Sequence, residues 1–232
     1  MDVFLSVLKP ALPLLYLFMI ASTGYVIFRV YQHKQLISQA GTKRVEGIAG
    51  NSLATEKMRI RKEARAKGLI GEEGVGALLE DLAEEFGLVV LHDLSMPGTT
   101  ANIDHILIQK KAVFVIDAKN YEGRVNIKKD SKGQVQLYVG GTKRTNLATK
   151  LSGYSETIEK YLKAEGISVR VVPLLAFYKA SFHPDSKYEI NGVMVNVSGV
   201  KNELMRFAVK NAAEIDQHEV ADLILKEFPA KD

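Results

Sequence analysis

The stretch that most constrains the fold is residues 103–119, in which two apolar, largely β-branched runs flank a short basic turn. This pattern predicts a β-hairpin that is buried on both faces. Four positions interrupt it, because Asp104, His105, Asp117 and Lys119 are polar or charged. Charges within buried strands are costly, so these side chains need a partner or a ligand.

The pairing register decides which of these charges meet. If the turn is centred on Lys110 and Lys111, Asp104 lies directly opposite Asp117, and alternation puts Lys119 on the same face as Asp117. Opposed residues have Cβ atoms roughly 5 Å apart, where two carboxylates repel unless something neutralises them. A divalent cation that prefers oxygen ligands, such as Mg²⁺, Mn²⁺ or Ca²⁺, would do so. Lys-Lys is poor chemistry for a two-residue turn, and a longer loop would shift the pairing.

Residues 68–86 predict an amphipathic helix whose core-facing stripe begins at Glu72. Two explanations for this acid stay open. It could stabilise the positive end of the helix dipole in a first turn, or it could add a third carboxylate to the cluster of Asp104 and Asp117. His105 points away from Asp104 by alternation, so we expect a core or hydrogen-bonding histidine rather than a ligand.

An uncharged segment precedes this helix. Residues 10–28 are 19 positions rich in Leu, Ile, Phe, Tyr and Val, close to the roughly 20 that span a bilayer as a helix. A cleaved signal peptide is the alternative, but Asp2 and the long apolar run favour an uncleaved anchor over residues 1–31, with 10–31 in lipid. Lys and Arg are denser after the span than before it. The N-terminus is therefore expected outside and the rest of the chain in the cytoplasm.

Residues 32–67 form a basic linker with a formal charge of +6. The whole chain carries +4 and residues 1–31 carry +1, which leaves −3 for residues 68–232. The basic character of the chain is therefore a property of the linker. A basic helix there could lie on anionic lipid or reach nucleic acid, and a solvated spacer is an equal alternative.

The domain at 68–232 continues with alternating signals for strands and helices. We expect strands at 88–92, 125–127, 135–139, 169–177 and 193–197, and helices at 146–165, 201–211 and 217–228. This order predicts an α/β fold in which helices flank one central mixed sheet.

Three pieces of this pattern together resemble the nuclease-related domain (NERD) family, a branch of the restriction-endonuclease-like PD-(D/E)xK superfamily. They are Lys67-Gly-x-x-Gly-Glu72, Ile103-Asp-His105 and Val115-Ile-Asp-Ala-Lys-Asn-Tyr-x-Gly123, and the resemblance covers roughly residues 68–150. It implies a restriction-endonuclease-like core. It also implies metal-dependent hydrolysis of phosphodiester bonds, with Mg²⁺ or Mn²⁺ as cofactor.

The resemblance also implies roles for individual residues. Carried over position by position, Asp104, Asp117 and the helix-borne Glu72 are metal ligands with catalytic roles, and Lys119 is the catalytic lysine. A bound cation would lower the pKa of a water and neutralise the phosphate. The ammonium group would stabilise developing negative charge or orient the nucleophile.

The chain departs from the family pattern in two places. The family commonly has Glu where Asp117 stands. It also tends to show Asn-Pro and then Gln at the start of the second long helix, whereas here Leu147 follows Asn146 and Lys150 stands where the Gln would be. The second departure concerns substrate positioning more than metal binding.

Residues 110–150 hold ten basic residues against three acidic ones, in a domain that is otherwise acidic. Phosphate contacts dominate nucleic-acid affinity, so we expect this segment to bind nucleic acid, with DNA as the expected substrate. The residues expected to do so are Lys110, Lys111, Arg124, Lys128, Lys143, Arg144 and Lys150. Solvated hairpin tips also carry lysines, which is the alternative explanation.

Two hypotheses follow from the sequence. In the first, the chain is a membrane-tethered, Mg²⁺-dependent nuclease that acts on DNA at the cytoplasmic face. In the second, it is a non-catalytic module that uses the same sheet to bind nucleic acid or a protein near the membrane. The chain has an acid or a lysine at all four positions that the resemblance assigns to catalysis, Glu72, Asp104, Asp117 and Lys119. This favours the nuclease, because a binding module gains nothing from opposed, buried carboxylates.

Overall fold

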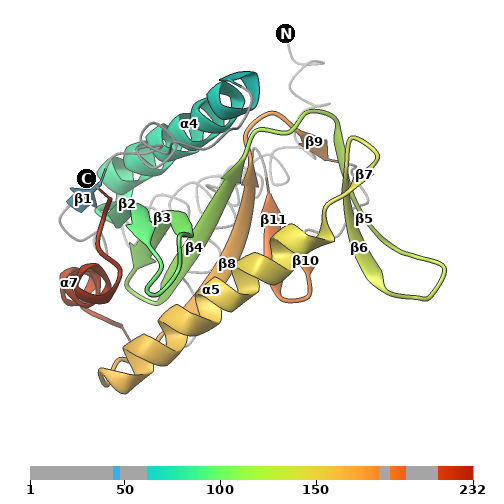
Figure 1. Ribbon diagram of the computed structural model, residues 1–232. Helices are drawn as coiled ribbons and strands as arrows, with labels where there is room; N and C mark the ends of the chain where they lie inside the picture. Colours follow the sequence, from blue (N-terminus) through green and yellow to red (C-terminus); the bar gives the residue numbers. More distant parts are fainter. Residues whose placement is uncertain (1–43, 48–61, 183–188, 197–213, 232) are drawn as a thin grey trace, which may run out of the picture. The chain divides into compact units, whose positions relative to one another are not determined.

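A seven-stranded mixed sheet organises the part of the chain that the computed structural model describes, residues 44–47, 62–182, 189–196 and 214–231 (Figure 1). Its strand order is β1-β2-β3-β4-β8-β11-β10. The strands are β1 (Arg44–Glu46), β2 (Val89–Ser95), β3 (Asn102–Gln109), β4 (Ala112–Lys119), β8 (Arg170–Phe177), β10 (Glu189–Ile190) and β11 (Val193–Asn196). The central strand β4 runs antiparallel to β3 and parallel to β8.

The hairpin of β3 and β4 has the predicted register. Gln109 pairs with Ala112 and His105 with Ile116, as a turn at the Lys-Lys pair requires. The next pair along this register would be Asp104 and Asp117, at the end where the two strands stop pairing. Alternation along the strands therefore works as expected from the apolar pattern.

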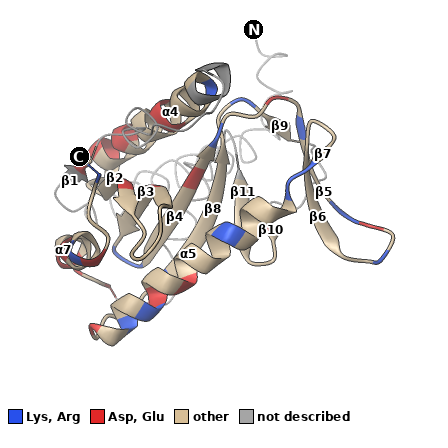
Figure 2. Ribbon diagram, in the orientation of Figure 1, with Lys and Arg blue, Asp and Glu red and all other residues tan. Residues whose placement is uncertain are grey.

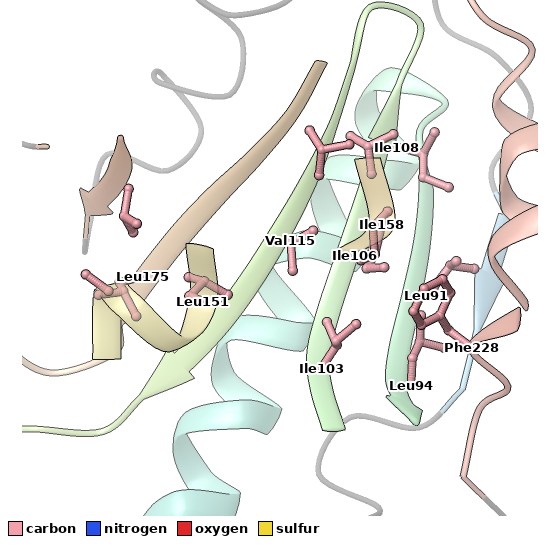
Figure 3. Close-up of a cluster of buried hydrophobic side chains, with 14 of the residues drawn as sticks. Leu91, Leu94, Ile103, Ile106, Ile108, Val115, Leu151, Ile158, Leu175 and Phe228 are labelled. Carbon is pink, nitrogen blue, oxygen red and sulfur yellow. The ribbon is translucent and has the colours of Figure 1, made fainter. Parts of the chain in front are cut away.

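Helices cover both faces of the central sheet (Figure 1). The side chains of α4 (Lys62–Phe86) pack into a cluster with alternate residues of β3, β4 and β8, such as Leu107, Phe114 and Leu174. The helices α5 (Thr145–Ala164) and α7 (Gln217–Glu227) bury the other face. Figure 3 shows part of that second cluster, with side chains from β2, β3, β4, β8, α5 and the end of α7. A sheet buried on both faces explains why its strands are nearly continuous apolar runs.

The strands expected at 125–127 and 135–139 pair with each other outside the central sheet. These strands, β5 (Arg124–Lys129) and β6 (Val135–Val139), join β7 (Thr142–Lys143) and β9 (Ser181–Phe182) in a second mixed sheet of order β7-β6-β5-β9. The expectation of one central sheet is therefore wrong. β7, which pairs with β6, and β9, which pairs with β5, are each only two residues long. Strands this short leave almost no periodic signal in the sequence.

The described residues form a mixed α/β fold with helices flanking the sheets, as predicted. Among the helices of these ranges, none is long and apolar enough to cross a bilayer. The expected anchor at 10–28, most of the linker at 32–67 and the expected helix at 201–211 lie outside the described residues.

Candidate functional site

The ammonium group of Lys119 links two aspartates from neighbouring strands. Its Nζ lies 2.7 Å from Oδ2 of Asp117 and 3.7 Å from Oδ2 of Asp104. The same ammonium donates to the carbonyl oxygen of Ala118 at 3.0 Å. Both carboxylates therefore lie close to one ammonium at the end of the β3–β4 ladder, where the sequence predicted that the charges would meet.

Backbone contacts fix the Asp104 carboxylate as well. Oδ2 of Asp104 accepts the backbone N–H of Ala118 at 2.8 Å, across the gap between β3 and β4. Asp104 is 7% exposed. Burial raises its pKa to about 7, with the nearby Asp117 adding to the rise, while Lys119 and the Ala118 amide oppose it. The carboxylate is thus poised near neutral pH.

Glu72 joins this group from α4. It is buried at 7% exposure, and burial raises its pKa to about 9, with the charge of Asp104 as the next cause. The helix begins at Lys62, so Glu72 lies well inside α4 rather than in its first turn. The helix-dipole explanation is therefore wrong. A carboxylate that faces the aspartate cluster is the arrangement found.

Lys119 counterbalances these acids. Burial opposes its charged form, but the carboxylates of Asp117 and Asp104 outweigh burial and raise its pKa. An ammonium that stays charged at every physiological pH is suited to stabilise negative charge and unsuited to accept a proton. The side chain of Asp117 is 16% exposed and therefore more accessible than that of Asp104, which is 7% exposed.

Glycines in α4 let the helix approach the ends of β4 and β8 closely. A Cβ on Gly71 would lie 2.8 Å from Cβ of Asn120, which directly follows β4. A Cβ on Gly74 would lie 2.3 Å from the ring of Tyr178, which directly follows β8. Asn120 also donates its side-chain amide to the carbonyl of Lys67 at 2.7 Å. Gly71 and Gly74 thus let α4 place Glu72 beside the strand ends.

Asp93 and Asn102, which sequence reasoning missed, lie next to this group of acids. Asp93 in β2 is 1% exposed and has a left-handed backbone with φ +54°. The side-chain amide of Asn102 donates to Oδ1 of Asp93 at 3.1 Å and to Oδ1 of Asp104 at 3.5 Å. The only sequence signal was a charge beside His92, directly after the predicted strand at 88–92, whereas the observed strand β2 continues to Ser95.

His105 is a buried, hydrogen-bonding histidine, as expected. It pairs across the ladder with His92, and the two Nδ1 atoms lie 2.8 Å apart. Burial lowers the pKa of both rings, so one neutral imidazole donates and the other accepts. Nε2 of His92 lies 3.3 Å from a carboxylate oxygen of Glu80 on α4. This pair ties β2, β3 and α4 together, and its His105 is the neighbour of Asp104 on β3.

The predicted basic residues divide between two regions. Lys110 and Lys111 form the β3–β4 turn, about 20 Å along the strands from Asp117 at roughly 3.3 Å per residue. The structure does not bring these two lysines to the site. The others lie beyond Lys119, in the second sheet and the start of α5, where Figure 2 shows blue segments. They are Arg124, Lys128, Lys143, Arg144 and Lys150.

Several of these cations lie over aromatic rings. The guanidinium of Arg144 lies 4.7 Å from the ring centre of Tyr121, and Tyr121 in turn packs against Phe177 at 6.2 Å. Tyr121 also acts on the Lys119 ammonium electrostatically, so Arg144 belongs to the neighbourhood of the site. Lys128 and Lys150 lie over rings of the second sheet and of α5 in the same way.

The donor set fits a hard divalent cation. Carboxylates outnumber the ammonium, and burial, together with the neighbouring carboxylates, raises the pKa values of Glu72 and Asp104. No group of three or more His, Asp or Glu side chains is arranged to hold an ion within the described ranges. Mg²⁺ is usually held by one or two carboxylates together with water and substrate phosphate, which Asp104 and Asp117 can provide.

Comparisons with known proteins match part of this chain. A stretch of 60 residues is 42% identical to an uncharacterized protein of Bacillus anthracis, over 25% of this chain and 28% of that protein. The chain thus spans little more than a quarter of that relative. No solved structure matches the chain. Residues 67–178 match the nuclease-related domain, a range that contains Glu72, Asp93, Asp104, Asp117 and Lys119. Residues 67–178 are thus a nuclease-related (NERD) domain.

Proposed function

We propose that this chain is a metal-dependent nuclease that hydrolyses phosphodiester bonds of DNA. One observation carries the proposal: a half-buried lysine lies 2.7 Å and 3.7 Å from two aspartates on adjacent strands, inside a nuclease-related domain. A fold does not by itself fix an activity, so the activity is proposed from the arrangement of Lys119, Asp104 and Asp117. Its acids and its ammonium correspond to the needs of phosphate hydrolysis.

Each residue has a physical role in the proposal. A bound Mg²⁺ or Mn²⁺ would supply an activated water and neutralise phosphate charge. Asp104 and Asp117 would hold the cation, and Glu72 would serve as a third acid, directly or through water. Lys119 would hold its proton and donate hydrogen bonds to the phosphate oxygens, where negative charge develops. The raised pKa of Lys119 supports this role.

The second sheet and the start of α5 supply the proposed nucleic-acid surface. Arg124, Lys143 and Arg144 lie there, and β5 follows only a few residues after Lys119. Such cations give affinity for the phosphate backbone without reading sequence. A substrate that runs from the strand ends over this sheet would pass the Lys119 ammonium.

The chain context belongs to the same proposal. The mixed sheet with α4 and α5 on opposite faces supports a restriction-endonuclease-like core. The uncharged segment at 10–28 and the basic residues after it support an anchor with its N-terminus outside and the nuclease domain in the cytoplasm.

Cleavage by matched lysine variants tests the proposal. The full chain, purified in detergent, is incubated with plasmid DNA and Mg²⁺ or Mn²⁺, beside Lys119→Ala, Asp117→Asn and the control Lys111→Ala. We expect the wild type and Lys111→Ala to cut alike, with the two site variants slower by roughly 100-fold or more. Circular dichroism confirms that each variant is folded. Cleavage by all four proteins, or by none, would reject the nuclease and leave a binding module.

A further inference from the structure

We propose that Asn102 and Asp93 form a positioning pair that sets the orientation of the Asp104 carboxylate. Asn102 stands two residues before Asp104 on β3, and Asp93 stands on the neighbouring strand β2. One side-chain amide lies within donating distance of both acids, at 3.1 Å from Asp93 and 3.5 Å from Asp104. Neither Asn102 nor Asp93 belongs to the motif pieces that suggested a nuclease.

Hydrogen bonds from different strands hold the two oxygens of Asp104. Oδ2 accepts the Ala118 N–H of β4, and Oδ1 faces the Asn102 amide of β3. A carboxylate held at both oxygens cannot turn about its last side-chain bond without losing one contact. The Asn102 amide has two N–H donors, so it can bridge two like-charged acids without adding a charge.

The backbone at Asp93 is built to present its side chain to Asn102. The β2–β3 ladder pairs His92 with His105 and Leu94 with Ile103, while Asp93 between them has φ +54°. A left-handed residue inside a strand is unusual for anything but glycine, although Asp tolerates it better than most residues do. Such strained positions gather at functional sites, and the cost is met by the surrounding structure.

The segment after α7 secures this strained residue from the outside. The N–H of Lys231 donates to the carbonyl of Asp93 at 3.0 Å, and the N–H of Ser95 donates to the carbonyl of Pro229 at 2.9 Å. Leu94 forms an isolated bridge with Ala230 between them. A chain of contacts therefore runs from residues 229–231 through Asp93 and Asn102 to Asp104.

A fixed orientation of the Asp104 carboxylate affects how tightly the site binds a metal ion. An oriented carboxylate needs no reorganisation when a cation arrives, and residues that orient a metal ligand typically change affinity by about 10–100-fold when removed. This step rests on the proposed function, because it treats Asp104 as a metal ligand. The orientation of Asp104 in the protein alone does not depend on it.

Crystal structures of the full chain test the orientation directly. We compare the wild type with Asn102→Ala and with the control Asn126→Ala, which lies on β5 of the second sheet. The proposal expects the Asp104 carboxylate to rotate, or to take two orientations, in Asn102→Ala alone. An Asp104 that keeps its wild-type orientation in Asn102→Ala overturns the proposal, whether or not the protein cuts DNA.

Titration calorimetry with Mn²⁺ then separates positioning from charge. We expect affinity to fall about 10-fold or more in Asn102→Ala and in Asp93→Ala. Asp93→Asn should keep most of the wild-type affinity, because its side-chain oxygen can still accept from Asn102. Equal losses in Asp93→Asn and Asp93→Ala would mean that Asp93 acts through its charge, which overturns its positioning role. A wild type that binds no Mn²⁺ refutes the metal-dependent function, while the crystal structures still decide the orientation.

Discussion

The buried acid Glu72 predicts an unusual dependence of stability on pH. Its pKa in the folded chain is about 9, against 4.5 for an ordinary glutamate. The folded state therefore binds a proton that the unfolded state releases between these values. Stability that is fully present below about pH 4.5 is lost as the pH rises toward 9. A carboxylate that is paired with a cation usually has a lowered pKa in the folded state, so its contribution to stability is lost as the pH falls.

The size of the effect follows from proton linkage. One proton contributes about 1.4 kcal/mol per pH unit, so the loss between about pH 5 and about pH 8 reaches at most about 4 kcal/mol. Glu72 is only 7% exposed, so solvent screens it little. In a chain of this size, such a loss lowers the melting temperature by roughly 10 °C. A divalent cation at a hundredfold excess over its Kd would restore about 2.7 kcal/mol at the alkaline end.

Thermal unfolding measured by circular dichroism checks this prediction. The full chain is melted in chelator-treated buffer at several pH values, beside Glu72→Gln, whose neutral amide cannot titrate. We expect a steep fall in melting temperature with pH in the wild type and a clearly flatter profile in Glu72→Gln. Asp104 titrates in both proteins, so some slope remains. Profiles of equal slope would refute the argument that Glu72 is buried beside the aspartates.

Two further predictions concern packing and substrate affinity. Gly71→Ala should destabilise the chain by about 1 kcal/mol or more, because its Cβ would press on the backbone just past β4. Gly153→Ala in α5, where a Cβ meets nothing within 4 Å, should instead stabilise it by roughly 0.5–1 kcal/mol in the same melting experiment. In filter binding without metal, Arg124→Ala and Lys143→Ala should each weaken DNA affinity and reduce the salt slope by about 1, and an unchanged slope would contradict the proposed surface. Lys110→Ala, at the far end of β4, should leave both unchanged.

The sequence predicted the central hairpin well because its information is local. Apolar runs on either side of a short basic turn predicted the register in which Gln109 pairs with Ala112, as the structure has it. The Glu72 stripe was equally legible from its helical period, and the structure decided between its two explanations. Asp104, Asp117 and Lys119 followed from the same alternation.

Contacts between segments far apart in the sequence could not be predicted in this way. The second sheet depends on β9, two residues long, which pairs with β5 more than fifty positions earlier, and no local pattern encodes that contact. Asp93 escaped notice because its left-handed backbone and its contact with Lys231, far along the chain, leave no local pattern in the sequence. The lysines of the β3–β4 turn were assigned to the site by charge alone, although strand length carries them to the other end.

The position of β4 between β3 and β8 affects the order in which the central sheet folds. β3 is its neighbour in sequence, but β8 begins at Arg170, about fifty residues after β4 ends. Parallel pairing across such a loop forms slowly, because the loop must close before any contact rewards it. During synthesis, Asp117 and Lys119 therefore stay hydrated on an open edge until β8 docks. The second edge of the strand that carries Asp117 and Lys119 is therefore completed only after Arg170–Phe177 has been made.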